Sequence, residues 1–388
     1  MRISAFAAGF LALRAGRTGR LKGSSGGGEV QTRRVLVLDP ATQRFNELEL
    51  AGYQVTAVHG MSDTELEQVL PGFDAVIVRS ANRITRSMLL ASPRVAIVGR
   101  AGSGVDNIDL ETASELGVPV VHAPSGNAGS VAELVLGLMI GVSRSIPSAH
   151  KTMTRGEWAK KDFKGRTLNG KTLGIIGFGS VGQALARLAV ALGMVVLLAE
   201  GFKVLPASEG VDEDNPVQPL SRREATAQGV GVTLPPLPLD ELLSKVDFLS
   251  VHCPLTEDTK GMISERELAL VKSSAVVINA ARGGVVDEKA LLRALEEGKL
   301  GGAALDVFAH EEAPLQDHVI NLCRSPNVLC TPHIGGLTEE AGERVLSEVC
   351  DLIFAFFEGR LPPSRIVNGN PDTKLSLARL PTSRPKNR

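Results

Sequence analysis

The sequence predicts an α/β protein with two doubly wound, mainly parallel sheets. Three observations carry this prediction. A glycine-rich segment between an apolar strand and a helix lies near the middle of the chain, at 171–192. Short apolar runs that alternate with helical stretches already fill residues 34–130, which predicts an earlier sheet of the same kind. The length of 388 residues leaves room for two or three domains.

The region before residue 130 provides the first sheet. Strands are expected near 34–38, 53–58, 73–78, 95–99 and 119–122. A long apolar helix follows at 130–144 and is expected to connect the two domains. A second long helix, at 339–357, can fold back on the first sheet. We therefore expect a first domain formed by 34–130 plus 334–368, and a second formed by 131–333.

The glycine motif Gly177-x-Gly179-x-x-Gly182 is the fingerprint of a Rossmann domain that cradles a dinucleotide. Gly177 permits the tight turn, Gly179 lets the backbone approach the pyrophosphate, and Gly182 lets the following helix pack close to the strand. The N-terminus of that helix, expected at 183–192, offers free N–H groups to the phosphates. Glu200 ends the next apolar run, where such folds place an acid that binds the ribose hydroxyls and favours NAD over NADP.

The rest of the second domain follows the same alternation. Further strands are expected at 194–199, 248–251, 275–278, 302–307 and 328–331. A turn and short helix are expected at 237–243, and a helix at 288–297. Residues 203–223 have no convincing period and indicate a surface insertion. Its Arg222 and Arg223 leave recognition of a 2′-phosphate, and hence NADP, as an alternative.

The two ends differ from the rest in composition. Residues 1–33 are basic and contain one acid, Glu29, which is typical of an organelle transit peptide. The apolar run 3–13 behind Arg2 also resembles a signal-peptide core. We expect a plastid or mitochondrial location, with a disordered extension and a cytoplasmic location as the alternative. The polar tail 369–388 is expected to be disordered.

The overall composition excludes several classes of protein. The net charge is −1 and no basic run lies in the core sequence, so we expect no nucleic-acid partner. No apolar run reaches the roughly 18–20 residues that span a bilayer, so we expect no membrane span. The four cysteines show no C-x-x-C spacing, which favours reduced thiols and indicates no metal site.

Three polar side chains follow three of the expected strands in the second domain. Arg282 follows the strand at 275–278, Glu311 follows the strand at 302–307, and His333 follows the strand at 328–331. Ligands of open α/β sheets bind at the carboxyl ends of the strands. A cation, a carboxylate and an imidazole are therefore expected to face one crevice.

Residues 34–368 closely resemble the D-isomer-specific 2-hydroxyacid dehydrogenases and, among them, the enzymes that act on D-3-phosphoglycerate. Five matching segments in the same order carry the resemblance: 98–107, 126–133, 168–177, 281–288 and 303–308. The resemblance implies a flavodoxin-like substrate domain and an NAD-binding Rossmann domain. It also implies a short form without the C-terminal regulatory domain of longer relatives.

The resemblance implies an Arg/Glu/His triad of Arg282, Glu311 and His333. Oxidation of a 2-hydroxy acid removes the hydroxyl proton, and histidine is a suitable base near neutral pH. The glutamate would hold the imidazole tautomer, and the arginine would bind the substrate carboxylate in a bidentate manner. The sequence around His310 loosens the family pattern, so Glu312 is an alternative to Glu311, although the spacing from Arg282 favours Glu311.

Family positions also imply the binding residues. The implied cofactor contacts are Asn82, Gly177, Gly179, Ser180, Val181, Gly182, Glu200, Cys253, Ala280, Ala281, Asp306, Gly335 and Gly336. The implied substrate contacts are Arg79, Ser80, Arg100, Gly102, Ser103 and Gly104. Two arginines in the second set suit a phosphorylated small molecule.

The expected reaction is the NAD-dependent oxidation of D-3-phosphoglycerate to 3-phosphohydroxypyruvate, the first step of L-serine biosynthesis. One alternative is a hydroxypyruvate or glyoxylate reductase with the same fold. Another, of a different class, is a dinucleotide-sensing co-repressor. The family commonly dimerises through its nucleotide domain, so a homodimer is expected.

Overall fold

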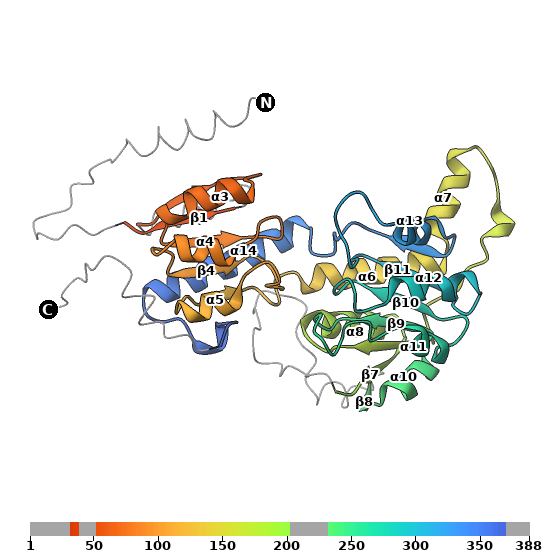
Figure 1. Ribbon diagram of the computed structural model, residues 1–388. Helices are drawn as coiled ribbons and strands as arrows, with labels where there is room; N and C mark the ends of the chain where they lie inside the picture. The colour runs from red at the N-terminus through yellow and green to blue at the C-terminus, as the bar shows by residue number, and fades with distance from the viewer. Residues whose placement is uncertain (1–31, 39–51, 202–231, 370–388) are drawn as a thin grey trace, which may run out of the picture. The chain divides into compact units, whose positions relative to one another are not determined.

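The computed structural model of the protein describes residues 32–38, 52–201 and 232–369 (Figure 1). The insertion expected at 203–223 lies outside the described residues. So do residues 1–31 of the expected targeting segment and the tail from 370 onward. Both sheets belong to one compact unit of the chain.

The first sheet has five parallel strands in the order β2-β1-β3-β4-β5. They are β1 (Arg34–Val37), β2 (Gln54–Ala57), β3 (Ala75–Val78), β4 (Ile97–Arg100) and β5 (Val120–His122). All four residues of β3 are buried, as are three of the four in β1 and β4, because helices cover both faces of the sheet. This strand order is that of the flavodoxin-like doubly wound fold.

Four of the described helices flank the first sheet: α3 (Asp63–Val69), α4 (Arg86–Ala91), α5 (Leu110–Glu115) and α14 (Glu339–Phe357). Helix α14 comes from the far end of the chain and packs on β4 and β5 (Figure 1). Its Val349 and Ile353 join the buried cluster of that face. A Cβ at Gly99 of β4 would collide with Val349, so the glycine allows the helix to lie close to the sheet.

The second sheet has seven parallel strands in the order β12-β11-β10-β9-β6-β7-β8. They are β6 (Thr172–Ile176), β7 (Val195–Ala199), β8 (Val232–Leu237), β9 (Phe248–Val251), β10 (Val276–Asn279), β11 (Gly302–Leu305) and β12 (Val328–Cys330). From β6 the chain adds β7 and β8 on one side, and then β9 to β12 on the other side. This reversal of strand order between β6 and β9 is that of the Rossmann fold. The predicted class, two doubly wound parallel sheets of which the second is a Rossmann domain, is confirmed.

Within the described ranges, seven helices accompany the second sheet: α6 (Ala128–Ser143), α7 (Ile146–Thr154), α8 (Ser180–Ala191), α10 (Leu239–Lys245), α11 (Glu265–Leu270), α12 (Glu288–Glu296) and α13 (Asp317–Arg324). Helices α6 and α8 pack side by side over one face, and α10 to α13 contribute to the buried cluster of the other (Figure 1). Short 3₁₀ turns are η1 (Leu70–Gly72), η2 (Lys160–Asp162) and η3 (Pro363–Arg365).

Two details differ from the sequence prediction. Strand β8 was not predicted, because Pro235 and Pro236 are unfavourable in a central strand. In the structure β8 is an edge strand, where prolines are tolerated. Helix α8 begins at Ser180 and not at Gln183, so it includes Gly182. A glycine is required there because a Cβ would collide with the carbonyl oxygen of Gly177.

The length and apolar composition of the helices in the described ranges bear on whether one could span a bilayer. None of the helices there is, by itself, long and apolar enough to cross a membrane. The pair α6 and α7 passes the length and composition test only when joined across a bend of 64°.

Candidate active site

Three neighbouring strands bring the predicted triad to one edge of the second sheet. Strands β10, β11 and β12 are adjacent and parallel, so their carboxyl ends meet at the same edge. Arg282 lies in the loop after β10, Glu311 in the loop after β11 and His333 in the loop after β12. The topology therefore explains how residues 51 positions apart reach one site.

The side chains of His333 and Glu311 are directly hydrogen bonded. The His333 Nδ1 to Glu311 Oε2 distance is 2.8 Å. The other carboxylate oxygen, Oε1, accepts from the backbone N–H of Phe308 at 3.2 Å. Of the two glutamates that the sequence left open, the structure thus places Glu311, and not Glu312, against the imidazole.

This hydrogen bond determines the tautomer of His333. An ionised carboxylate only accepts, so Nδ1 carries the proton and Nε2 is left to accept a proton from a ligand. The bond to Glu311 raises the pKa of His333 above its ordinary value, while burial and the charge of Arg282 oppose the rise. Burial acts to raise the pKa of Glu311, but the bonds and charges of its neighbours, His333 first, hold it below its ordinary value.

The buried carboxylate of Asp306 fixes the loop that carries His333. Its Oδ1 accepts from the Thr331 hydroxyl at 2.6 Å and from Ile334 N–H at 2.8 Å. Its Oδ2 accepts from Gly335 N–H at 2.8 Å, and a Cβ at Gly335 would lie only 2.9 Å from that oxygen. The structure thus shows an Asp306 carboxylate bonded to donors on both sides of His333, and the cofactor contact that the resemblance implies for Asp306 stays a prediction.

The backbone of His333 is strained, with a φ of 54° in the left-handed region. Its N–H donates to the carbonyl oxygens of Asp306 at 2.8 Å and Thr331 at 3.1 Å. Such a conformation persists only where surrounding bonds enforce it. The loop therefore has one well-defined shape that presents the imidazole to the sheet edge.

Arg282 is held by a turn that the sequence analysis did not identify. The buried Asn279 at the end of β10 donates to the carbonyl oxygen of Arg282 at 2.9 Å and accepts from Ala281 N–H at 3.1 Å. The guanidinium donates to the Ala281 carbonyl at 2.7 Å and, through Nε, to Asp106 Oδ2 at 2.8 Å. The asparagine at the end of the expected strand is the feature of the sequence that could have predicted this turn.

Arg100, the last residue of β4, adds a second cation beside Arg282. Burial first, and then the charge of Arg282, lower the pKa of Arg100 to about 10; Asp106 opposes this and Arg79 adds to it. The buried Nε of Arg100 has no hydrogen-bond partner among the described residues. The local charge is therefore positive, which favours an anion beside these two arginines.

The predicted glycines of the loop after β4 lie against the two guanidinium groups. A Cβ at Gly102 would collide with Arg100, and a Cβ at Gly104 would collide with Arg282. The carbonyl oxygen of Ser103 is bonded to His122 Nδ1 at 2.7 Å. The carbonyl oxygen of Arg79 accepts from the amide of Asn107 at 2.7 Å, and the adjoining Ser80 is exposed.

The geometry of the glycine loop fits a dinucleotide pyrophosphate. Gly177 has a φ of 92°, and a Cβ there would lie 2.6 Å from the backbone carbon of His252. Nothing lies within 4 Å of an ideal Cβ at Gly179, so space is open in front of the loop. Helix α8 begins at the next residue, and no side chain caps its first N–H groups. Free donors at a helix N-terminus beside open space form a phosphate site.

The other implied cofactor residues have different surroundings. Val181 lies in the first turn of α8, Glu200 is exposed just after β7, and Ala280 and Ala281 follow β10. Cys253 is buried, and burial raises the pKa of its thiol to about 11, so it stays protonated. A Cβ at Gly336 would lie 2.7 Å from the amide nitrogen of Asn127.

Asn82 is bonded within the loops of the first sheet. Its side-chain amide donates to the Met61 carbonyl at 2.7 Å and to Asp63 Oδ1 at 3.2 Å. Its backbone carbonyl accepts from the Asn107 side chain at 2.6 Å. No described bond joins it to the glycine loop. In the structure Asn82 thus connects loops of the first sheet, and its implied cofactor contact stays a prediction.

The chain was then compared with known proteins. Residues 136–335 match the model of the D-isomer specific 2-hydroxyacid dehydrogenase, NAD binding domain. The chain is 40% identical to a D-3-phosphoglycerate dehydrogenase of Methanocaldococcus jannaschii over 329 residues, which are 84% of this chain and 58% of the relative. It is 38% identical to a hydroxypyruvate reductase of Thermotoga maritima over 323 residues, which are 83% of this chain and 97% of the relative.

Solved structures show the same fold. The TT0316 protein of Thermus thermophilus has a TM-score of 0.72 and 31% identity, covering 86% of this chain and 99% of that one. A D-lactate dehydrogenase of Aquifex aeolicus, complexed with NAD and lactic acid, has a TM-score of 0.71 and 26% identity, covering 87% and 99%.

The chain belongs to the D-isomer-specific 2-hydroxyacid dehydrogenase family, and NAD is the cofactor of its Rossmann domain. Several relatives at 37–40% identity are D-3-phosphoglycerate dehydrogenases. The chain spans a little over half the length of these relatives, 56–58%.

The first prediction concerns the ionisation of His333. In the wild-type protein the pKa of His333 is raised above its ordinary value because the Glu311 carboxylate stabilises the imidazolium. Glu311→Gln removes that charge, so the pKa of His333 is expected to fall. Histidine NMR titration measures it, and Glu312→Gln, one residue along the same exposed loop, is the matched control with an unchanged value. The same pKa of His333 in the two variants would contradict the assignment of Glu311 as the partner of His333.

Proposed function

We propose that the chain oxidises D-3-phosphoglycerate to 3-phosphohydroxypyruvate with NAD, as the first step of L-serine biosynthesis. The observation that carries the proposal is the meeting of Arg282, Glu311 and His333 at one sheet edge, with Arg100 close by. The names of several relatives at 37–40% identity support the same substrate.

His333 is the proposed general base. Its Nε2 accepts the proton of the C2 hydroxyl while the C2 hydrogen leaves as hydride with its electron pair, and C2 becomes a carbonyl carbon. Bound NAD supplies the hydride acceptor. Glu311 stabilises the imidazolium that forms. Because His333 must be neutral to accept the proton, oxidation becomes faster as pH rises through its raised pKa, and the reverse reduction becomes slower.

Arg282 is the proposed ligand of the substrate carboxylate. In the structure its Nε donates to Asp106, whose side chain is 71% exposed, while the Arg282 side chain is 27% exposed. An exposed ion pair contributes little net stability. A substrate carboxylate that accepts two parallel bonds from the guanidinium would therefore displace Asp106 at small cost.

Arg100, together with Arg79, favours a phosphorylated substrate. A 2-hydroxy acid without phosphate has one anionic group, which Arg282 alone can bind. The positive charges of Arg100 and the nearby Arg79 provide for a second anion. Glu200, exposed after β7, is proposed to accept from the ribose hydroxyls of NAD.

The second candidate is a hydroxypyruvate reductase. The observation that favours it is the Thermotoga maritima relative, 97% of which is covered at 38% identity. Such an enzyme would use the same triad in the reducing direction. The two candidates differ in whether the phosphate of the substrate increases kcat/KM.

An assay of the wild-type protein with both substrates tests the proposal. NADH formation from D-3-phosphoglycerate is expected to exceed NADPH formation, and hydroxypyruvate is expected to be the poorer substrate. His333→Asn should lower kcat by about 10²–10⁴-fold, the usual contribution of a general base, while NAD binding is retained. His59→Asn, at an exposed histidine of the first sheet's loops, is the control. Activity on hydroxypyruvate alone, or full activity of the His333 variant, would refute the proposal.

Arg100 should determine the preference for phosphate. Arg100→Gln keeps a polar side chain in place but removes the charge, so the KM for D-3-phosphoglycerate is expected to rise about tenfold or more, the loss of one charged hydrogen bond of about 1.5–3 kcal/mol. The rate with hydroxypyruvate should change little in the same variant. Equal losses for both substrates would show that Arg100 does not bind the phosphate.

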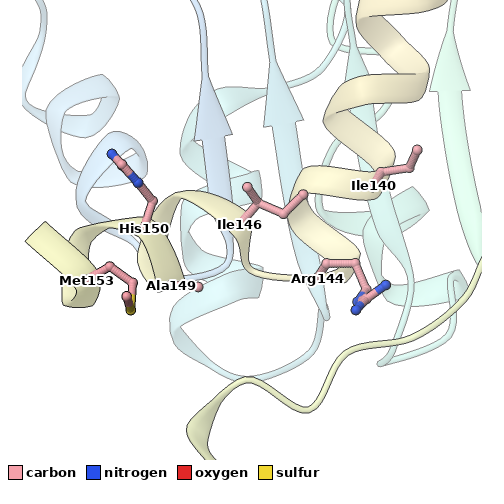
Figure 2. Close-up of a pocket in the computed structure, with 6 residues that line it drawn as sticks. All are labelled: Ile140, Arg144, Ile146, Ala149, His150 and Met153. Carbon is pink, nitrogen blue, oxygen red and sulfur yellow. The ribbon is translucent and has the colours of Figure 1, made fainter. Parts of the chain in front are cut away.

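We also propose a homodimer that forms through α6 and α7. A groove of about 410 Å³ lies between these helices, lined by Ile140, Arg144, Ile146, Ala149, His150 and Met153 (Figure 2). Helix α7 buries none of its own residues. Ile146 and Met153 are 50% and 54% exposed, and contiguous apolar surface of this kind is typical of a protein interface. Since α6 packs on the second sheet, a second copy would dock on the nucleotide domain.

The dimer is tested by light scattering coupled to size-exclusion chromatography. The wild-type protein is expected to have the mass of two chains. The double variant Ile146→Glu, Met153→Glu should have the mass of one chain, because it places charges in the apolar contact. Leu90→Glu, at a 54% exposed leucine on the first sheet's α4, is the matched control and should remain a dimer. A monomeric wild type would contradict the proposal.

A further inference from the structure

A second glutamate–histidine pair lies behind the proposed active site. Glu288 is the first residue of α12 and is 6% exposed. Its Oε1 accepts from the backbone N–H of Ala309 at 2.6 Å, and its Oε2 lies 3.1 Å from Nε2 of His318 on α13. A buried carboxylate is costly unless its oxygens are bonded, and both oxygens of Glu288 are.

Glu288 is not needed to cap its own helix. The neighbouring Asp287 is the N-cap of α12 and accepts from the N–H groups of Lys289 and Ala290. Asp287 also accepts from the hydroxyl of Ser264 at 3.0 Å, at the start of α11. The two adjacent acids thus face different partners, and only Glu288 is bonded to the loop after β11.

That loop carries Glu311, and its position depends on hydrogen bonds. Residues 309–317 are exposed, so burial of apolar side chains contributes little to holding them. Phe308 N–H binds Glu311, and the next N–H along the chain, that of Ala309, binds Glu288. The bond to Glu288 therefore attaches the loop to a helix of the Rossmann domain two residues before Glu311.

The turn that carries Arg282 contacts the same part of the loop after β11. A Cβ at Gly283 would collide with the carbonyl group of Phe308 and the nitrogen of Ala309. The backbones of the two loops are therefore in contact where Glu288 binds Ala309. A shift of Ala309 would disturb both the support of Arg282 and the position of Glu311.

We propose that Glu288, oriented by His318, is a positioning residue that holds Glu311 against His333 through Ala309. The role rests on the proposed function of His333 as the base, and Glu288 itself touches no reacting atom. The charged groups that act on His333 are Glu311, Asp306 and Arg282. Of these, Glu311 is the one whose place depends on the Glu288 bond.

Glu288→Ala tests the proposal by two readouts. Histidine NMR titration of the protein without ligands should give a lower pKa for His333, in the same direction as Glu311→Gln. The acid limb of kcat/KM for oxidation should move to lower pH, and kcat should fall about 10–100-fold, as expected for misplacement of a supporting group. Glu288→Gln should restore both readouts largely, because its amide oxygen still accepts from Ala309 N–H.

Asp287→Ala is the matched control. It removes the N-cap of the same helix and should lower the melting temperature, but it leaves the pKa of His333 unchanged. A Glu288→Ala protein that is merely less stable, with the wild-type titration of His333, would overturn the proposal. If Glu288→Ala does not fold, His318→Ala carries the test: a smaller fall in the pKa of His333 is expected, and no fall would overturn the proposal.

The outcomes also separate this inference from the proposed function. Wild-type protein that oxidises no 2-hydroxy acid would refute the function, while the titration without ligands still decides whether Glu288 positions Glu311. An active enzyme whose His333 titration is indifferent to Glu288 would refute the positioning role alone.

Discussion

The hydrogen bond between Glu311 and His333 is the interaction on which the proposed chemistry of this protein depends. It fixes the proton on Nδ1, leaves Nε2 as the acceptor and raises the pKa of the imidazole. Neither side chain is deeply buried: that of His333 is 45% exposed and that of Glu311 is 39% exposed. Their geometry must therefore be imposed by the backbones on which they sit.

The buried carboxylates of Asp306 and Glu288 hold these two backbones in place. Asp306 binds donors on both sides of His333 and holds its strained backbone. Glu288 binds the loop of Glu311 from the start of α12. Buried acids with all their oxygens bonded are rigid supports, because any displacement would leave an unpaired charge in the interior. The geometry of the exposed His333–Glu311 pair thus depends on these buried carboxylates.

The parts of the fold and site that are local in sequence could be predicted. The strand–helix alternation and the glycine motif predicted both sheets, and spacing from Arg282 favoured Glu311, the glutamate that is hydrogen bonded to His333. Edge strand β8 could not be predicted, because its prolines are tolerated only at a sheet edge, which is a property of the whole sheet. Glu288 and Ala309 are 21 residues apart, and their bond depends on how α12 meets a loop. The sequence contains no periodic signal for such a contact.

Arg282 joins this rigid site to Asp106 in the loop after β4, and Arg100 lies nearby at the end of that strand. A single substrate that spans these groups is the central claim, and a crystal structure with NAD and D-3-phosphoglycerate tests it most directly. The expected result has the C2 hydroxyl oxygen within hydrogen-bond distance of His333 Nε2, the carboxylate on Arg282 in place of Asp106, and the phosphate on Arg100. A substrate carboxylate bound away from Arg282, or a hydroxyl out of reach of His333, would contradict the account.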